Sequence, residues 1–306
     1  MFASHPNLGP LKVVNRKKLK MAKLLPDQVK ELWQRVEQQN LSSKDFYMEQ
    51  ERLLNGYRNI WKNALCLDAR QDLEESILLE LGQYLGHGDL PEIRNRCQRA
   101  MASLITDWQE KVAVEDRQSV EQFYDDNETY IYDLMWWHTL NGDSSPLAYV
   151  TALEFAQQQG CRHYLDFGAG VGSGSILFAR HGLEVTLADI SSSLQRFSQW
   201  RFEKREHPAQ FIDLKTSRLP IGAFDFVTAM DVFVHLVDPV ETIEHLSDTL
   251  KPGGFLFARL AAELDEDHPQ HITQDFRPTF DRLQELGFVQ VWQDHWIWGH
   301  VVFQKP

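Results

Sequence analysis

Residues 164–174 read YLDFGAGVGSG, a short apolar run that passes directly into a glycine-rich segment. This pattern is typical of a β-strand that turns into a helix. Glycines at such a turn let the backbone approach a ligand closely, and the following helix presents free N–H groups. The spacing differs from the G-x-G-x-x-G of dinucleotide-binding turns, because the sixth residue counted from Gly168 is Ser173. The stretch therefore predicts a ligand-binding turn at the end of a strand.

Short apolar segments continue beyond this turn, and helical stretches separate them. Strands that alternate with helices predict an α/β fold with a parallel, doubly wound sheet. Near the C-terminus, residues 287–291 and 296–303 flank a short polar segment, which predicts an antiparallel hairpin at the sheet edge. The parallel strands are expected at residues 163–167, 184–188, 224–230 and 255–260.

The first 140 residues have a different pattern. Glycine and proline are sparse there, and apolar residues recur at helical spacing, as in the run from Phe46 to Trp61. Gly86 and Gly88 interrupt this pattern before Pro91 opens another helix. We therefore predict an all-α N-terminal or cap region at residues 1–140 and an α/β domain at residues 141–306.

Two motifs give the α/β region a resemblance to a known family. A D-x-G-x-G-x-G pattern is matched position for position by Asp166, Gly168, Gly170 and Gly172. K-P-G-G at residues 251–254 stands directly before an apolar strand. These motifs resemble those of class I S-adenosylmethionine (SAM) dependent methyltransferases. The resemblance covers roughly residues 145–306, and it implies SAM as cofactor and a Rossmann-like, seven-stranded sheet with an antiparallel C-terminal hairpin.

The resemblance also implies how the cofactor is held. The glycine motif, which includes Ala169, would wrap the methionine portion of SAM, and Asp166 would help to place its ammonium group. A carboxylate near a cationic amine gains a charge-assisted hydrogen bond. In the family an acidic residue near the third strand meets the adenine amino group, and Asp213 takes that position. The neighbouring candidates for cofactor contact are Ile190, Leu214 and Met230.

Asp189 ends the second predicted strand. An acidic residue there can accept hydrogen bonds from both ribose hydroxyls, as in dinucleotide-binding folds. The alternative is that Asp189 caps the helix that begins near Ser191. Combined with the glycine motif, the position favours ribose binding.

Two histidines follow predicted strands. Methyl transfer from a sulfonium is an in-line displacement, and a histidine base helps when the acceptor is a hydroxyl or ammonium group. His235 follows the fourth strand, and His271 lies in the loop after the fifth, where active sites of open α/β sheets are found. A structural role for His235 and an exposed loop position for His271 are the alternatives. His300, inside the terminal strand, is expected to be structural.

An aromatic segment at residues 130–138 precedes the α/β domain. It either lines an acceptor pocket or packs in the core, because an aromatic stripe at helical spacing is compatible with both. Tyr130 and His138 carry polar groups that need partners, which favours the pocket for these two residues. Tyr130, His138, His235 and His271 are thus the candidate catalytic residues.

Composition and charge limit the classes of partner. A formal net charge of −13 over 306 residues argues against a nonspecific nucleic-acid binder. No apolar run approaches the ~20 residues that span a bilayer, and the start lacks a signal-peptide core, so we expect a cytoplasmic protein without a membrane partner. Three separated cysteines without a C-x-x-C pair predict neither a disulfide framework nor a zinc site, and we find no other metal-ligand cluster.

The chain has a negative net charge, but a patch of basic residues lies near its start. We interpret it as a solvated arm, with an anionic partner as the alternative. Its residues are Lys12, Arg16, Lys17, Lys18, Lys20 and Lys23.

The sequence therefore favours a methyltransferase that acts on an oxygen or nitrogen atom of a small molecule enclosed by the helical cap. A macromolecular or carrier-tethered substrate, such as a peptide or RNA, is the second hypothesis, and the basic patch is its support. A third hypothesis is an idle SAM-binding scaffold whose helical region mediates assembly, for example as a homo-oligomer. An NAD-dependent oxidoreductase fits least well, because the glycine spacing is wrong for it.

Overall fold

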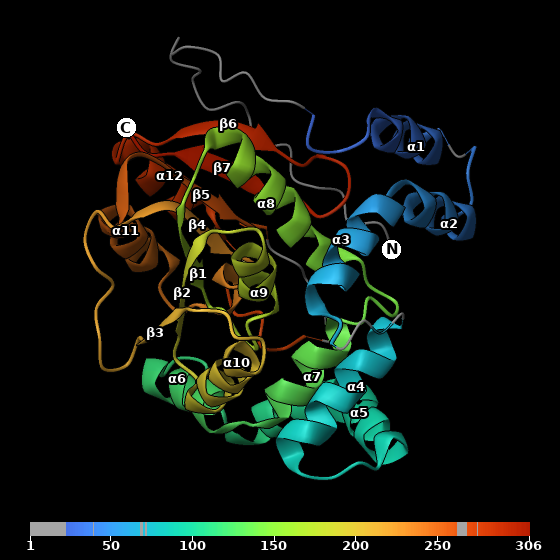
Figure 1. The fold of residues 1–306 in the computed structure, drawn as a ribbon. Helices are drawn as coiled ribbons and strands as arrows, with labels where there is room; N and C mark the ends of the chain where they lie inside the picture. The colour runs from blue at the N-terminus through green and yellow to red at the C-terminus, as the bar shows by residue number, and fades with distance from the viewer. Residues whose placement is uncertain (1–22, 39, 68–69, 71, 262–267, 274) are drawn as a thin grey trace.

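The computed structural model describes residues 23–38, 40–67, 70, 72–261, 268–273 and 275–306, which fold into helices and one seven-stranded sheet (Figure 1). The α-helices are α1 (Asp27–Glu37), α2 (Ser43–Leu53), α3 (Asn55–Leu65), α4 (Leu73–Leu85), α5 (Leu90–Lys111), α6 (Arg117–Asp126), α7 (Thr129–Trp137), α8 (Ala148–Gln159), α9 (Ser173–Arg180), α10 (Ser192–Lys204), α11 (Pro239–Thr249) and α12 (Arg277–Glu285). Two 3₁₀ turns are η1 (Ser145–Leu147) and η2 (Phe233–His235). The strands are β1 (His163–Phe167), β2 (Glu184–Asp189), β3 (Gln210–Asp213), β4 (Phe224–Ala229), β5 (Leu250–Ala258), β6 (Val289–Gln293) and β7 (Val301–Gln304).

The strands lie in the order β3-β2-β1-β4-β5-β7-β6. Strands β1 to β5 run parallel, whereas β7 pairs antiparallel with both β5 and β6. The predicted α/β fold with an antiparallel C-terminal hairpin is confirmed. The strand order reverses between β1 and β4, and ligands bind open α/β sheets outside the carboxyl ends of the strands at such a point.

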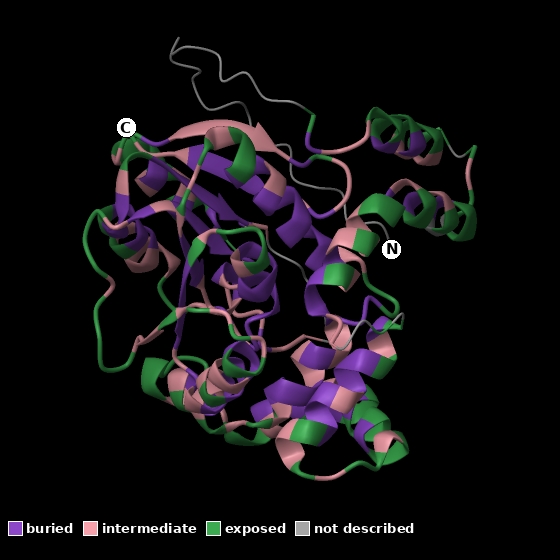
Figure 2. Cartoon of the chain, viewed as in Figure 1, coloured by how far each residue is buried: buried purple, intermediate pink, exposed green. Residues whose placement is uncertain are grey.

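Helices cover both faces of the sheet. Successive side chains of a strand point to opposite faces, so Tyr164 of β1 packs in a core with α8, α9 and α10, while Leu165 packs in a second core with α11 and α12. The first core continues into the helical region through residues such as Trp61 and Met135. Figure 2 shows this burial running from the sheet into α3 and α4.

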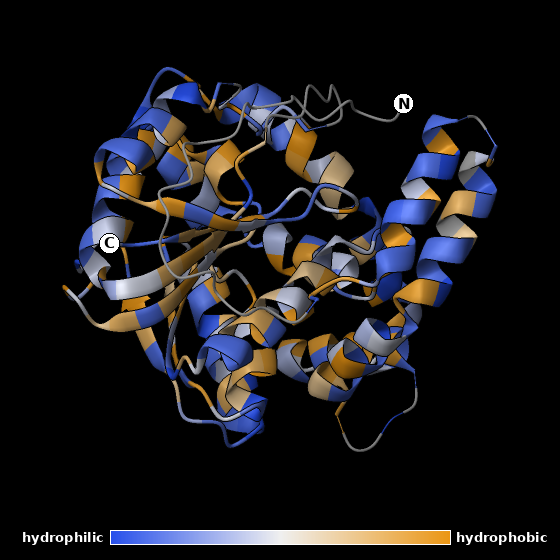
Figure 3. Ribbon diagram, turned by 90° about the horizontal axis from the view of Figure 1, so that it is seen from above, coloured by the Kyte–Doolittle hydropathy of each residue, from blue (hydrophilic) through white to orange (hydrophobic). Residues whose placement is uncertain are grey.

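The helices α1 and α2 lie apart from the sheet as a pair that is mostly exposed (Figures 1 and 2), and the view from above shows apolar and polar residues mixed along both helices (Figure 3). Val29, Leu32 and Phe46 are their buried hydrophobic residues among those described. Across the described ranges, no helix combines the length and apolarity that crossing a bilayer requires. Of the basic patch, Lys23 pairs with Asp27 at the start of α1, while Lys12, Arg16, Lys17, Lys18 and Lys20 lie outside the described residues.

A buried ion triad joins the helical region to the α/β domain. Glu80 of α4 accepts two hydrogen bonds from Arg201 of α10, at 3.0 and 3.2 Å, and further bonds from Arg205. The Glu80 and Arg201 side chains are 1% and 0% exposed. Arg201 also donates to the carbonyl of Val171 at 2.7 Å and to the hydroxyl of Ser173 at 2.8 Å. The triad therefore connects α4 directly to the glycine-rich turn.

Replacing Glu80 should destabilise the whole fold. Glu80→Gln leaves the buried Arg201 charge without its counter-charge, and breaking a buried pair in this way costs about 3–5 kcal/mol. We expect the free energy of unfolding from urea titration to fall by that amount.

Glu75→Gln is the matched control on the same helix. Its partner Arg70 is at 3.3 Å, and the two side chains are 54% and 37% exposed, so the loss should stay within ~1 kcal/mol. Equal losses in the two variants would show that the triad does not stabilise the fold.

Candidate active site

The turn after β1 requires glycine at two positions for packing as well as conformation. Gly168 and Gly170 have φ angles of 71° and 55°, which favour glycine. A Cβ atom on Gly168 would lie 2.5 Å from Val232, and one on Gly170 would lie 2.9 Å from Leu134 of α7. Helix α7 of the cap region thus packs directly on the turn.

Asp189 lies at the end of β2, beside this turn. Its carboxylate accepts hydrogen bonds from the backbone N–H groups of Gly170 at 2.8 Å and Ser191 at 2.9 Å. Burial raises its pKa above the ordinary value. The hydroxyl of Ser191, rather than Asp189, caps α10 by accepting from the N–H of Leu194. Asp189 therefore does not cap α10, which was the alternative to ribose binding.

A cavity of about 1200 Å³ opens at the carboxyl ends of β1, β2 and β4, with α6 and α7 among the elements that line it. The candidate cofactor residues that line this cavity are Gly168, Ala169, Gly170, Asp189, Ile190, Leu214 and Met230.

Three candidate cofactor residues do not line the cavity. Asp166 is fully buried, and it accepts hydrogen bonds from Ser175 at 2.7 Å and Thr228 at 2.9 Å. Burial raises the pKa of Asp166 to about 6. Gly172 faces α10, and Asp213 accepts from the backbone N–H of the residue two positions later in the chain. Asp166 therefore holds β1 to α9 and β4 from behind the turn.

All four candidate catalytic residues line the cavity. Tyr130 and His138 are 7% and 4% exposed, and within the described structure neither the Tyr130 hydroxyl nor either His138 ring nitrogen has a hydrogen-bond partner. The His138 ring stacks on Trp137 and meets Trp61 edge-on. Buried polar groups rarely stay unpaired, so these groups mark a place for a ligand or ordered water.

His235 has a defined tautomer. Its Nδ1 atom lies 3.0 Å from the carbonyl of Gln270 and 2.9 Å from the hydroxyl of Tyr124. A carbonyl oxygen can only accept, so Nδ1 carries the proton and Nε2 keeps its lone pair. Burial lowers the pKa of His235 to about 4. The ring of His271 packs against His235 with centroids 5.0 Å apart.

Sequence reasoning missed Tyr124, Asp231 and Arg259. Asp231 follows β4 with an unfavourable φ of 47° and pairs with Arg259 at 2.8 Å, and both line the cavity. Strained residues of this kind cluster at functional sites. The position of Asp231 at the carboxyl end of β4 is the signal that could have indicated it. His300, expected to be structural, is 2% exposed, directly precedes β7 and also lines the cavity.

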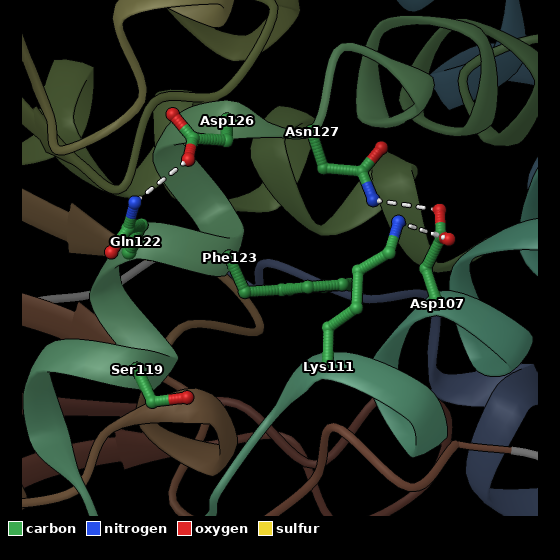
Figure 4. A pocket seen from close by; sticks show the side chains of 7 residues that line it. All are labelled: Asp107, Lys111, Ser119, Gln122, Phe123, Asp126 and Asn127. Atoms are coloured by element: carbon green, nitrogen blue, oxygen red, sulfur yellow. Dashed lines mark hydrogen bonds and ion pairs between the residues drawn. The ribbon is translucent and has the colours of Figure 1, made fainter.

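A smaller pocket lies between α5 and α6 (Figure 4). Asn127 donates to Asp107 at 3.3 Å, and Gln122 donates to Asp126 at 3.1 Å. The hydroxyl of Ser119 accepts from the backbone N–H of Ala113 at 3.0 Å, and the other polar side chains pair with one another, so we assign this pocket no role. Throughout the described ranges, no group of three or more His, Cys, Asp or Glu residues is arranged to hold a metal ion.

Residues 165–256 match the family model for a methyltransferase domain. The chain carries a class I, SAM-dependent methyltransferase domain. This confirms the resemblance indicated by the glycine motif and K-P-G-G. The chain is 32% identical over 131 residues to a ubiquinone biosynthesis O-methyltransferase of Coxiella burnetii, an alignment that covers 40% of this chain and 55% of that protein. A protein of the same name from Xanthomonas euvesicatoria is 33% identical over 135 residues, with 40% and 54% covered.

The aligned part of this chain thus covers about half the length of these curated relatives. Among solved structures, a SAM-dependent methyltransferase of Leishmania major is 15% identical, with a TM-score of 0.49 and coverage of 65% of this chain and 88% of that one. Phosphoethanolamine N-methyltransferase 2 of Haemonchus contortus, solved with SAM, is 22% identical, with a TM-score of 0.37 and coverage of 42% and 33%.

The buried histidines beside the methyltransferase domain's cavity should make the fold sensitive to acid. Burial lowers the pKa of His138 to about 3, below its ordinary 6.5. Between these values the unfolded chain binds a proton that the folded chain does not. The contribution of neutral His138 to the free energy of unfolding is therefore complete above pH 6.5, and below this pH it falls by about 1.4 kcal/mol per pH unit.

His138→Phe keeps a ring in the stack and removes the titrating group. Carboxyl groups with a raised pKa stabilise the fold as the pH falls, which is opposite to the effect of His138. We therefore measure the free energy of unfolding in urea between pH 6.5 and 4.5 for variant and native protein, and compare their changes with pH. We expect the variant to lose less stability with acid, and His295→Gln, at an exposed position, to match the native protein. Parallel pH curves for all three proteins would contradict a neutral buried His138.

Proposed function

We propose that this protein transfers a methyl group from SAM to an oxygen or nitrogen atom of a small molecule bound in the cavity. The cavity is the single observation that supports this proposal most strongly. The glycine turn and Asp189 line it together with Tyr130 and His138, whose polar groups have no hydrogen-bond partner among the described residues. Its volume of about 1200 Å³ exceeds the ~300–1,000 Å³ typical of pockets for one ligand, which leaves room for donor and acceptor together.

The residues present fit SAM as cofactor. The space that a Cβ atom would fill at Gly168 and Gly170 lets the backbone approach the methionine portion. In this proposal Asp189 receives the ribose hydroxyls, Ala169, Ile190, Leu214 and Met230 flank the nucleoside, and Asp213 lies on the adenine side. Asp166 and Gly172 support the turn from behind. The bound cofactor supplies an activated methyl group on a sulfonium, and the protein aligns it and excludes water.

The acceptor would lie among Tyr130, His138, His235 and His271. His235 is able to take a proton, because its Nε2 atom keeps the lone pair. With a pKa of about 4 it is a weak base, however, so in this role it mainly orients the acceptor through Nε2.

Ion pairs at both ends of α6 favour a small acceptor over a macromolecule. Arg117 pairs with Glu241 of α11 at 2.6 Å, and Asp125 pairs with Lys215 after β3 at 2.6 Å. Helix α6 is thereby held across the cavity between two parts of the α/β domain. The relatives named for ubiquinone biosynthesis act as O-methyltransferases, which supports oxygen as one acceptor atom.

Asp189→Ala should weaken SAM binding by about 1–3 kcal/mol through loss of hydrogen bonds to a charged group. Calorimetric titration of native and variant protein with SAM, S-adenosylhomocysteine and NAD measures this directly. Asp126→Ala, in the smaller pocket outside the cavity, is the matched control and should bind SAM normally.

Binding of NAD in place of SAM would overturn the proposed function. Unchanged SAM affinity in Asp189→Ala would show that Asp189 does not bind the ribose, and it would leave the proposed reaction unaffected. SAM binding without turnover of any acceptor, small or macromolecular, would favour the idle-scaffold hypothesis.

A further inference from the structure

One face of α7 meets the cavity. The positions 130, 133, 134 and 137, with the C-cap residue 138, follow helical spacing, and all five residues line the cavity, as does Trp136 beside them. Leu134, at the centre of this face, packs on Gly170 of the glycine turn. Tyr130 and Asp133 lie toward the N-terminal end of that contact, while Trp137 and His138 lie toward its other end. The α7 face therefore lies over the place that the cofactor is proposed to occupy.

Asp133 is the carboxyl group on this face of α7, and the proposed function above gives it no role. It is partly buried, it lines the cavity, and no hydrogen bond or salt bridge joins it to the chain within the described ranges. Its titratable neighbours are Tyr130 on its own helix, Cys97 of α5 and His268 in the loop after β5. Burial raises the pKa of Asp133 to about 6, and His268 opposes this effect. A carboxylate at a cavity wall to which no described residue donates a hydrogen bond favours a hydrogen-bonding partner from the ligand.

The charges around the cavity favour a cation as that partner. Among the described lining residues there are eight carboxylates and four cations. Arg117, Lys215 and Arg259 each pair with a carboxylate at 2.6–2.8 Å, and Arg218 is exposed at the surface. An anionic acceptor would therefore find no buried cation free to receive it.

Aromatic rings lie next to Asp133. Tyr130, one turn away on α7, stacks on Tyr124 with centroids 5.2 Å apart, and its buried hydroxyl has no hydrogen-bond partner among the described residues. Ring faces attract ammonium groups, and the combination of a carboxylate with aromatic rings suits an amine better than a neutral alcohol.

We propose that Asp133 and Tyr130 form the acceptor subsite, that the acceptor is a primary or secondary amine, and that Asp133 binds it as an ammonium ion and removes its proton. This inference rests on the proposed function and narrows its substrate class.

The proton and electrons balance in this reaction. The ionised Asp133 takes one proton from the ammonium group, which frees the nitrogen lone pair. The nitrogen then bonds to the methyl carbon while the carbon–sulfur bond breaks, and the electron pair of that bond stays on sulfur in neutral S-adenosylhomocysteine. The product leaves as a methylated ammonium ion, and Asp133 returns its proton to water. With a pKa of about 6, Asp133 is a stronger base than His235, whose pKa is about 4.

The test uses three probes of matched shape: benzylamine, benzyl alcohol and benzoate. Each is titrated into the full-length protein saturated with S-adenosylhomocysteine at pH 7.5. We expect benzylamine to bind at least about tenfold more tightly than benzyl alcohol, and benzoate to bind most weakly. Asp133→Asn should abolish the preference for the amine, whereas the control Asp126→Asn should keep it. The amine preference of the native protein should also decline below pH 6, as Asp133 becomes protonated.

The outcomes separate the two proposals. Failure of the native protein to bind S-adenosylhomocysteine removes the proposed function, and the inference with it. If the native complex forms, equal binding of amine and alcohol, preference for benzoate, or no binding of any probe overturns the inference alone. Retained amine preference in Asp133→Asn overturns it as well. Weaker S-adenosylhomocysteine binding in Asp133→Asn overturns it too, because Asp133 would then hold the ammonium group of the cofactor.

Discussion

The geometry of the site depends on the buried charge of Arg201. A guanidinium does not lose its proton inside a protein, so a fully buried one must keep a counter-charge and satisfied N–H groups. Arg201 obtains the first from Glu80 in the helical region and part of the second from Val171 and Ser173 in the glycine-rich turn. The conformation of the turn is therefore set from behind by a helix that precedes it by about ninety residues in the chain.

The contact of Leu134 with Gly170 constrains the same turn from the cavity side. Together with Arg201 it places the turn between two parts of the helical region. The helices before the α/β domain are thus part of the site's framework, and the first hydrophobic core runs through both regions without a break.

The sheet and its turn could be predicted from sequence because their signals are local: strand length, alternation with helices, and glycine at fixed offsets. The same locality limited the prediction of individual side chains. A motif match locates Asp166 along the turn but does not show which way it points. In β1 it shares a face with Tyr164, two residues earlier, and so it faces the buried helix side instead of the cavity. For Asp189, the sequence does not show whether it or the neighbouring Ser191 caps α10, and in the folded chain the cap is Ser191.

The proposed acceptor side could not be predicted to the same depth, because it is built from long-range packing. The spacing of residues 130–138 is compatible with core and with pocket, and α7 does both: Met135 is fully buried, while Asp133 lines the cavity. Tyr124 and His235 are 111 residues apart in the chain, and no local pattern relates them. Asp133 belongs to no sequence motif, and its proposed role follows from the lack of a hydrogen bond or salt bridge to it among the described residues, which only a folded structure reveals.

Two sets of ion pairs attach the helical region to the α/β domain, and they differ in how far they are buried. The triad of Glu80, Arg201 and Arg205 lies out of reach of water and dissolved ions. The pairs at the ends of α6 are partly solvated, and each is worth about 0–1 kcal/mol, less at high salt. Val120 and Phe123 of α6 are buried as well, so helix α6 stays packed on the core when these pairs are screened. Dissolved salt therefore acts on the two attachments differently, because it screens the outer pairs and does not reach the triad.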